Sequence, residues 1–149
     1  MDVTPFDLAQ RLIGLKETFG KKANPLIVAM CQLDARWVED DETPWCSAFV
    51  NFLCFLLGVQ RSRSLAARSW LLVGTSIPLT DAQRGYDVVV LSRGKDPHPP
   101  AWVINAPGHV GFYAGQTPTT VEILGGNQGD AVSVASFPKA RILSIRRLL

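Results

Sequence analysis

Cys46 is the residue whose position most directly suggests chemistry. It follows Thr43-Pro44-Trp45 and lies at the start of an apolar run that ends at Gly58. Threonine caps helices, proline is tolerated in the first helical turn, and glycine readily ends a helix. We therefore expect a central, buried helix that is capped by Thr43 and begins at Pro44. Cys46 would lie in its first turn, where backbone N–H groups and the helix dipole favour the nucleophilic thiolate.

The cysteines also have a structural explanation. A free cysteine commonly serves as a small apolar core residue, so position alone leaves both interpretations open for Cys46. Cys31 and Cys54 lie in apolar helical patterns, and we expect both in the core. The three cysteines include no CxxC pair. This spacing argues against a disulfide framework or a zinc site and favours reduced thiols.

His109 is a candidate general base. It follows Gly108 and opens a predicted strand, where a base can be held firmly while it faces a cleft. Without Cys46, a hydrogen-bonded surface histidine would be the simpler explanation. The other histidine, His98, lies among prolines in a long loop, and we expect it to be exposed to solvent.

A third polar group comes from the glycine-rich stretch at residues 125–129, Gly-Gly-Asn-Gln-Gly. Its composition is typical of a tight turn. It also ends the strand after that of His109, so in a meander Asn127 would lie near the imidazole. An asparagine oxygen can accept the histidine N–H and so orient a nucleophile–base pair. Glu122 is the alternative orienting residue, and Asp87 is predicted to hold a turn.

Helical patterns precede strand patterns along the chain. Helices are predicted over residues 4–19, 24–33, 44–57 and 65–72, and strands over 87–91, 109–114, 120–124, 131–136 and 142–145. This order predicts an α+β fold in which N-terminal helices pack on a largely antiparallel sheet of about five strands. The length of 149 residues suits a single domain.

The long, proline-rich segment 94–108 is predicted to be a functional or mobile loop. Trp102 lies in it, close to His109 in the sequence. This tryptophan either shapes a substrate cleft or packs the loop against the domain, and the sequence does not decide between the two.

Bulk properties limit the partners. A formal net charge of +2 argues against nucleic acid as the main partner. No apolar run approaches the ~20 residues of a membrane span, and the N-terminus does not resemble a signal peptide. We therefore expect cytoplasmic synthesis without a signal peptide and no membrane insertion.

The acidic run at residues 39–42 lacks the spacing of a calcium loop. An acid close to Cys46 would raise the pKa of its thiol and oppose the thiolate. We expect the side chains of this run to be solvated instead, and we expect no metal or cofactor.

Five motifs in order resemble the NlpC/CHAP superfamily of papain-like cysteine peptidases and amidases. The similarity spans residues 5–146 and is greatest to small phage-type endolysins and bacterial peptidoglycan hydrolases. The motifs are Thr43-Pro44-Trp45-Cys46-Ser47-Ala48-Phe49-Val50-Asn51, Ala67-Arg68-Ser69-Trp70-Leu71, Asp87-Val88-Val89-Val90, Gly108-His109-Val110-Gly111-Phe112-Tyr113 and Gly125-Gly126-Asn127-Gln128.

The resemblance implies a role for each candidate. Cys46 would be the nucleophile, His109 the general base and acid, and Asn127 the residue that orients His109. The backbone N–H of Cys46 would contribute to an oxyanion hole. Further candidates for the substrate cleft are Trp45, Trp102 and Gln128.

The function that this resemblance implies is hydrolysis of a peptidoglycan amide bond. The bond would lie in the peptide stem, in a cross-link, or between N-acetylmuramoyl and L-alanine. We expect a monomeric phage endolysin, without a separate wall-binding domain, that acts in host lysis at the wall or periplasm after release. The alternatives are a secreted antibacterial toxin with an immunity protein, a papain-like amidase or deamidase with a non-wall substrate, and a non-catalytic wall-binding module.

Overall fold

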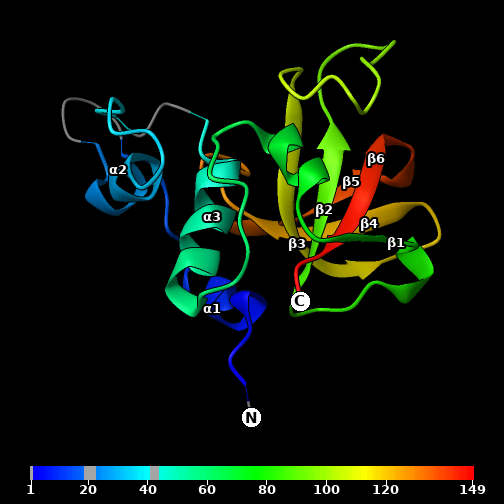
Figure 1. Ribbon diagram of the computed structural model, residues 1–149, viewed down its shortest axis with the longest axis horizontal. Helices are drawn as coiled ribbons and strands as arrows, with labels where there is room; N and C mark the ends of the chain where they lie inside the picture. Colours follow the sequence, from blue (N-terminus) through cyan, green and yellow to red (C-terminus); the bar gives the residue numbers. More distant parts are fainter. Residues whose placement is uncertain (1, 19–22, 41–43) are drawn as a thin grey trace.

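The N-terminal half of the chain forms helices and the C-terminal half forms a sheet (Figure 1). The computed structural model describes residues 2–18, 23–40 and 44–149. Within these residues there are three α-helices, α1 (Pro5–Arg11), α2 (Pro25–Gln32) and α3 (Cys46–Leu57), and three short 3₁₀ helices, η1 (Ala67–Leu72), η2 (Leu79–Asp81) and η3 (Lys139–Arg141). None of the described helices has the length and apolar composition needed to cross a membrane.

The sheet has six strands in the described part of the chain, in the order β1-β6-β2-β3-β4-β5, and every pairing is antiparallel. The α+β class is therefore confirmed, but the expected count of five strands is wrong. The additional strand is β1, which has three residues and no apolar pattern that would have marked it. The strands are β1 (Thr75–Ile77), β2 (Asp87–Ser92), β3 (Gly108–Gln116), β4 (Thr120–Gly125), β5 (Ser133–Pro138) and β6 (Ile142–Arg147).

The first two helices begin where the sequence predicts. Thr4 caps α1 in a capping box with Asp7, and Asn24 caps α2 by accepting the Leu26 N–H at 3.0 Å. Helix α1 ends at Arg11 and is shorter than predicted, because the following residues turn to pair with the segment around Ala131. The predicted helix over 65–72 is a 3₁₀ helix, η1.

Helix α3 differs from the prediction at its start. Its N-cap is Trp45 and its first residue is Cys46, so Pro44 precedes the helix; the expected cap, Thr43, lies outside the described residues. Gly58 ends the helix with a φ of 66°, as predicted. The body of the helix is buried, but Phe55 and Leu56 near its end are half exposed, so the expectation of no solvent-facing side is wrong there.

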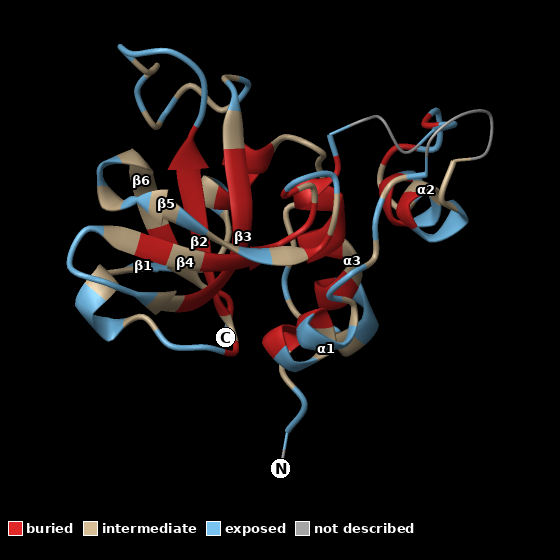
Figure 2. Ribbon diagram, turned by 180° about the vertical axis from the view of Figure 1, so that it is seen from behind, coloured by how far each residue is buried: buried red, intermediate tan, exposed pale blue. Residues whose placement is uncertain are grey.

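The sheet separates two apolar cores. Side chains alternate across a strand, so Val88 and Val90 of β2 face the helices while Val89 and Leu91 face the opposite side. Both central strands, β2 and β3, are buried along most of their length (Figure 2). Helix α3 thus packs on a face of the sheet from which water is excluded.

The turn after β4 crosses the start of α3 at very short range. A Cβ at Gly126 would lie 2.7 Å from the Trp45 ring and 2.8 Å from Cβ of Phe49. From the other side, the segment after α1 holds the turn, since the N–H of Glu17 donates to the carbonyl of Asp130 at 2.9 Å. The side chain of Glu17 also accepts the Trp45 indole N–H at 2.8 Å. The start of α3 and residues 126–132 are therefore fixed against each other.

Replacing Gly126 by alanine should disturb this contact. We expect Gly126→Ala to lower the free energy of unfolding by about 1–3 kcal/mol, because the added methyl overlaps both Trp45 and Phe49. Urea unfolding would measure the change. The matched control is Gly129→Asn, where φ is 65°, no atom lies within 4 Å of the added Cβ, and asparagine tolerates this conformation. The free energy of unfolding of this control should remain within about 1 kcal/mol of the wild-type value. A Gly126→Ala protein as stable as the wild type would contradict the close packing.

Candidate active site

The Cys46 thiol lies in the first turn of α3, buried beside strand β3. Its exposed fraction is 3 %, and it forms no disulfide. The backbone N–H groups of Val110, Ser47 and Cys46 itself lower the thiol pKa, and so does the charge of Arg93. Because Val110 follows His109 in β3, the sulfur faces the part of the strand that carries the candidate base.

Burial outweighs these favourable groups. Desolvation is the largest influence on Cys46 and raises the pKa of its thiol above the ordinary value of 9.0. The N–H groups at the helix start do favour the thiolate, as expected, but burial outweighs them and the free protein holds a neutral thiol at neutral pH. Of the acidic run, Glu39 and Asp40 are exposed, and the remaining two residues lie outside the described part of the chain.

His109 is the second residue of β3, with an exposed fraction of 5 %. Its ring lies 5.3 Å from that of Phe137, and its Nε2 lies 2.8 Å from Oε1 of Gln128. Burial lowers the pKa of His109 most strongly; the hydrogen bond to Gln128 raises it, and the charges of Arg93 and Arg141 lower it further. The net effect favours a neutral imidazole, which is the form a general base needs.

Gln128 determines which ring nitrogen carries the proton. Its Nε2 donates to the carbonyls of Ile123 at 3.1 Å and Ser133 at 2.7 Å, so its Oε1 must accept from His109. The proton of the neutral ring is therefore on Nε2, and Nδ1, on the other side of the ring, is available to accept a proton. Gly125 makes room for this arrangement, since a Cβ there would lie 2.6 Å from Oε1 of Gln128.

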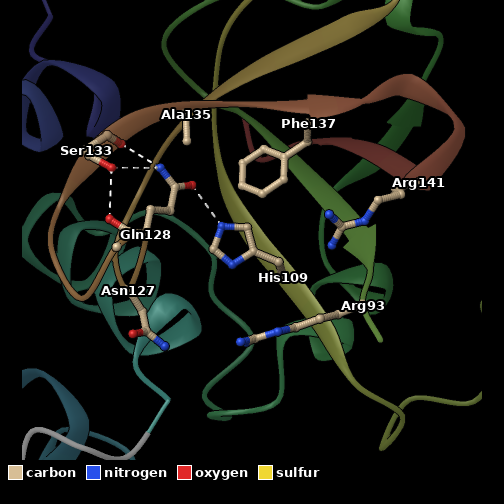
Figure 3. Close-up of a pocket in the computed structure, with 9 residues that line it drawn as sticks. Arg93, His109, Asn127, Gln128, Ser133, Ala135, Phe137 and Arg141 are labelled. Atoms are coloured by element: carbon tan, nitrogen blue, oxygen red, sulfur yellow. Dashed lines mark hydrogen bonds between the residues drawn. The ribbon is translucent and has the colours of Figure 1, made fainter. Parts of the chain in front are cut away.

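The structure assigns the orienting contact to Gln128, not to Asn127. Asn127 has a φ of 57° and lines the same pocket, but its side chain points away from His109 (Figure 3). The alternative, Glu122, lies near the other end of β4 with its carboxylate over Gly115. The turn lies where the sequence predicts it, and the residue that hydrogen-bonds His109 is Gln128, one position after Asn127.

Three segments that are distant in sequence meet at this site. Gly126 packs on the start of α3, Gln128 binds His109, and the N–H of Val110 faces the Cys46 thiol. Beside them is an open pocket of about 430 Å³ (Figure 3). Cys46 is not among the residues that line it. The lining residues are Arg93, His109, Asn127, Gln128, Gly129, Ser133, Ala135, Phe137 and Arg141.

Two of the predicted cleft residues lie elsewhere. Trp45 is fully buried beneath Gly126, so it is a core residue. Trp102 is 81 % exposed and lies over a separate depression with Leu72 and Ile104, outside the His109 pocket. Gln128 does line the pocket, as expected for a cleft residue. His98, expected to be solvent-exposed, is partly buried and lies 3.1 Å from the hydroxyl of Ser92.

Arg68 holds the long loop between β2 and β3. The side chain is fully buried, and it donates to the carbonyls of Pro100 at 2.7 Å and of Pro99 and Pro107 at 3.1 Å. The loop is thus anchored from within, and its tryptophan faces solvent.

Arg93 and Arg141 are pocket residues that were not identified from the sequence. Arg93 directly follows β2 and Arg141 directly precedes β6. The pairing of Leu91 with both His109 and Ile142 brings the end of β2 next to the starts of β3 and β6. Only the strand order reveals that Arg93 and Arg141 are neighbours, because the pairing of β2 with β6 joins positions about 50 residues apart. Among the described residues, no group of three or more His, Cys, Asp or Glu side chains could hold a metal ion.

Comparisons with known proteins identify the fold. No protein-family model matches the sequence, and a search of curated proteins found no match. The structure is similar to that of NlpC1 from Trichomonas vaginalis, with a TM-score of 0.59 and 19 % sequence identity over 97 % of this chain. The chain spans 42 % of the length of that protein. The fold is therefore NlpC-like.

The protonation state of His109 can be measured directly. In long-range ¹H–¹⁵N NMR spectra we expect the Nε2–H tautomer and a pKa below the ordinary value of 6.5, because burial disfavours the imidazolium. Gln128→Glu should raise this pKa by placing a carboxylate beside the ring, and Gln128→Leu should lower it by removing the acceptor. A pKa above 6.5 in the wild type, or an Nδ1–H tautomer, would contradict the arrangement.

Proposed function

We propose that this protein hydrolyses amide bonds of bacterial peptidoglycan through a cysteine nucleophile. Cys46 is the nucleophile, His109 is the general base and acid, and Gln128 orients His109. The observation that carries the proposal is the 2.8 Å hydrogen bond between His109 and Gln128, formed next to the strand position that faces the Cys46 thiol. A base held by a third group beside a nucleophile is the arrangement that acyl transfer requires.

In the first half of the reaction, Nδ1 of His109 accepts the proton of the Cys46 thiol as the sulfur attacks the amide carbonyl carbon. Charge develops on the carbonyl oxygen, and the N–H of Cys46, unpaired within the first turn of α3, can stabilise it. His109 then donates its proton to the leaving nitrogen. The C–N bond breaks, and the acyl group remains on sulfur.

In the second half, water replaces the amine. His109 accepts a proton from this water, the hydroxide attacks the thioester carbonyl, and the C–S bond breaks. The sulfur recovers its proton from His109, and the products are a carboxylic acid and an amine. Throughout, Gln128 accepts the Nε2–H and stabilises the imidazolium that forms transiently.

The proposed substrate rests on the five motifs and on the NlpC-like fold, which is similar to that of NlpC1 from Trichomonas vaginalis. The cellular role that we propose is lysis of a host bacterium by a phage-type, CHAP-like enzyme that reaches the wall after release from the cytoplasm. A secreted antibacterial toxin would use the same chemistry and would be accompanied by an immunity protein. Expression in the periplasm of a test bacterium should cause lysis in either case.

Digestion of purified sacculi tests the chemistry. The wild type should release soluble fragments, and Cys46→Ala should release none above background, because alanine supplies no nucleophile. Mass spectrometry of the new termini identifies the bond that is cut. The matched control is Cys54→Ala, which removes a buried thiol of the same helix away from the site and should keep most of the activity.

The result also separates the alternative functions. Equal fragment release by wild type and Cys46→Ala would exclude the cysteine mechanism. Sedimentation with sacculi without cleavage would indicate a wall-binding module. Cleavage of another amide without activity on sacculi would favour a different amidase.

The pH dependence should follow His109. The neutral ring is the active base, and burial places its pKa below 6.5, so kcat/KM should stay constant at neutral pH and fall only as the pH drops through this lower pKa. Between this lowered pKa and the value of ~6.5 for a histidine in the unfolded chain, the unfolded chain binds more protons than the folded chain. The free energy of unfolding should therefore also decrease as the pH falls. An acid limb centred above 6.5 would be inconsistent with a buried neutral base.

A further inference from the structure

The pocket beside His109 carries positive charge and no compensating acid. Arg93 and Arg141 both line it, and its other polar members, Asn127, Gln128 and Ser133, are neutral, as is the imidazole of His109. No carboxylate belongs to the lining, all of which lies in the described part of the chain. Two cations over one small pocket repel each other unless an anion lies between them.

Arg141 is held in a fixed orientation. Its Nε and Nη2 donate to the carbonyl of Ser92 at 3.0 and 2.8 Å, and its guanidinium lies 5.5 Å from the centre of the Phe137 ring. These contacts use one edge of the guanidinium. Its remaining N–H groups, two on Nη1 and one on Nη2, have no hydrogen-bond partner within the described residues. The side chain is thus preorganised to donate into the pocket.

Arg93 approaches the pocket from the other side of His109. It is exposed, forms no ion pair within the described residues, and extends past the imidazole (Figure 3). It lines the pocket together with His109, and its charge lowers the pKa of both Cys46 and His109. An anion held by Arg93 and Arg141 would therefore lie beside the bond that is cut.

We infer that Arg93 and Arg141 bind a carboxylate of the substrate next to the scissile amide, and so select acidic peptides over amidated ones. This inference rests on the proposed function and specifies the substrate class of the same site. Arginine matches a carboxylate because its planar N–H groups can contact both oxygens. The pocket volume of about 430 Å³ and its Phe137 and Ala135 walls suit a compact peptide group. Stem peptides of peptidoglycan supply such a group wherever the α-carboxyl of the γ-linked glutamate is free.

Two soluble muropeptides that differ only in this α-carboxyl, free or amidated, provide the test. The wild type should cleave the free acid with a kcat/KM at least about tenfold higher, the loss expected for one charged hydrogen bond. Arg141→Gln should remove most of this preference by raising KM for the free acid. Arg93→Gln should do the same and also shift the pH profile, because Arg93 acts on His109 as well. Arg11→Gln, an exposed arginine on α1, is the matched control and should keep the wild-type preference.

Binding separates this inference from the proposed function. Calorimetry with Cys46→Ala measures affinity for both muropeptides without turnover. Tighter binding of the free acid to Cys46→Ala, lost in Cys46→Ala/Arg141→Gln, supports the carboxylate site. If the wild type at the same time cleaves neither peptide, only the hydrolase proposal is overturned. Cleavage of both peptides with equal kcat/KM and equal binding would overturn the carboxylate site and leave the hydrolase intact.

Discussion

The turn that carries Gln128 can cross the start of α3 only because residue 126 has no side chain. This contact sets the depth at which residues 126–132 lie against Trp45 and Phe49. Gln128 then reaches His109, and its own amide nitrogen is anchored on the carbonyls at the end of β4 and the start of β5. Helix α3 places the Cys46 thiol against the N–H of Val110, the residue after His109. A shift of the turn by one methyl group would therefore be transmitted to both His109 and the start of α3, since close-packed interiors transmit strain.

The Cys46 thiol and the His109 imidazole are both uncharged in the free protein. Burial raises the pKa of Cys46 and lowers that of His109, so both are neutral in the free protein. A thiolate–imidazolium pair in the same position would have to overcome desolvation of both ions. In the proposed mechanism, the ion pair therefore forms only when attack begins, and the sulfur's charge then moves onto the substrate oxygen. The positive charge of Arg93, which lowers the pKa of Cys46, would favour both anionic stages of this proposed mechanism.

Several residues of the recognised motifs support the site without belonging to it. Ser47 donates to the carbonyl of Ser64 at 2.6 Å and accepts the indole N–H of Trp70 at 2.9 Å. Asn51, one turn further along α3, accepts the backbone N–H of Arg63 at 2.9 Å. These bonds tie the chain after α3 back onto the helix, because buried polar groups must be paired. Ser47 and Asn51, the polar residues of this apolar helix, therefore fix the scaffold around Cys46.

The sequence by itself determined the α+β order, the caps at Thr4 and Asn24, the end of α3 at Gly58, and the turn after β4, because each depends on residues within a few positions. It also singled out Cys46 and His109, through motif order. Only the tertiary structure decided that Gln128 and not Asn127 orients the imidazole, because adjacent residues of a turn point in different directions and spacing cannot choose between them. The sixth strand, the burial that neutralises Cys46, and the meeting of Arg93 with Arg141 depend on strand order and packing. These are contacts between residues far apart in the chain, and no local pattern encodes them.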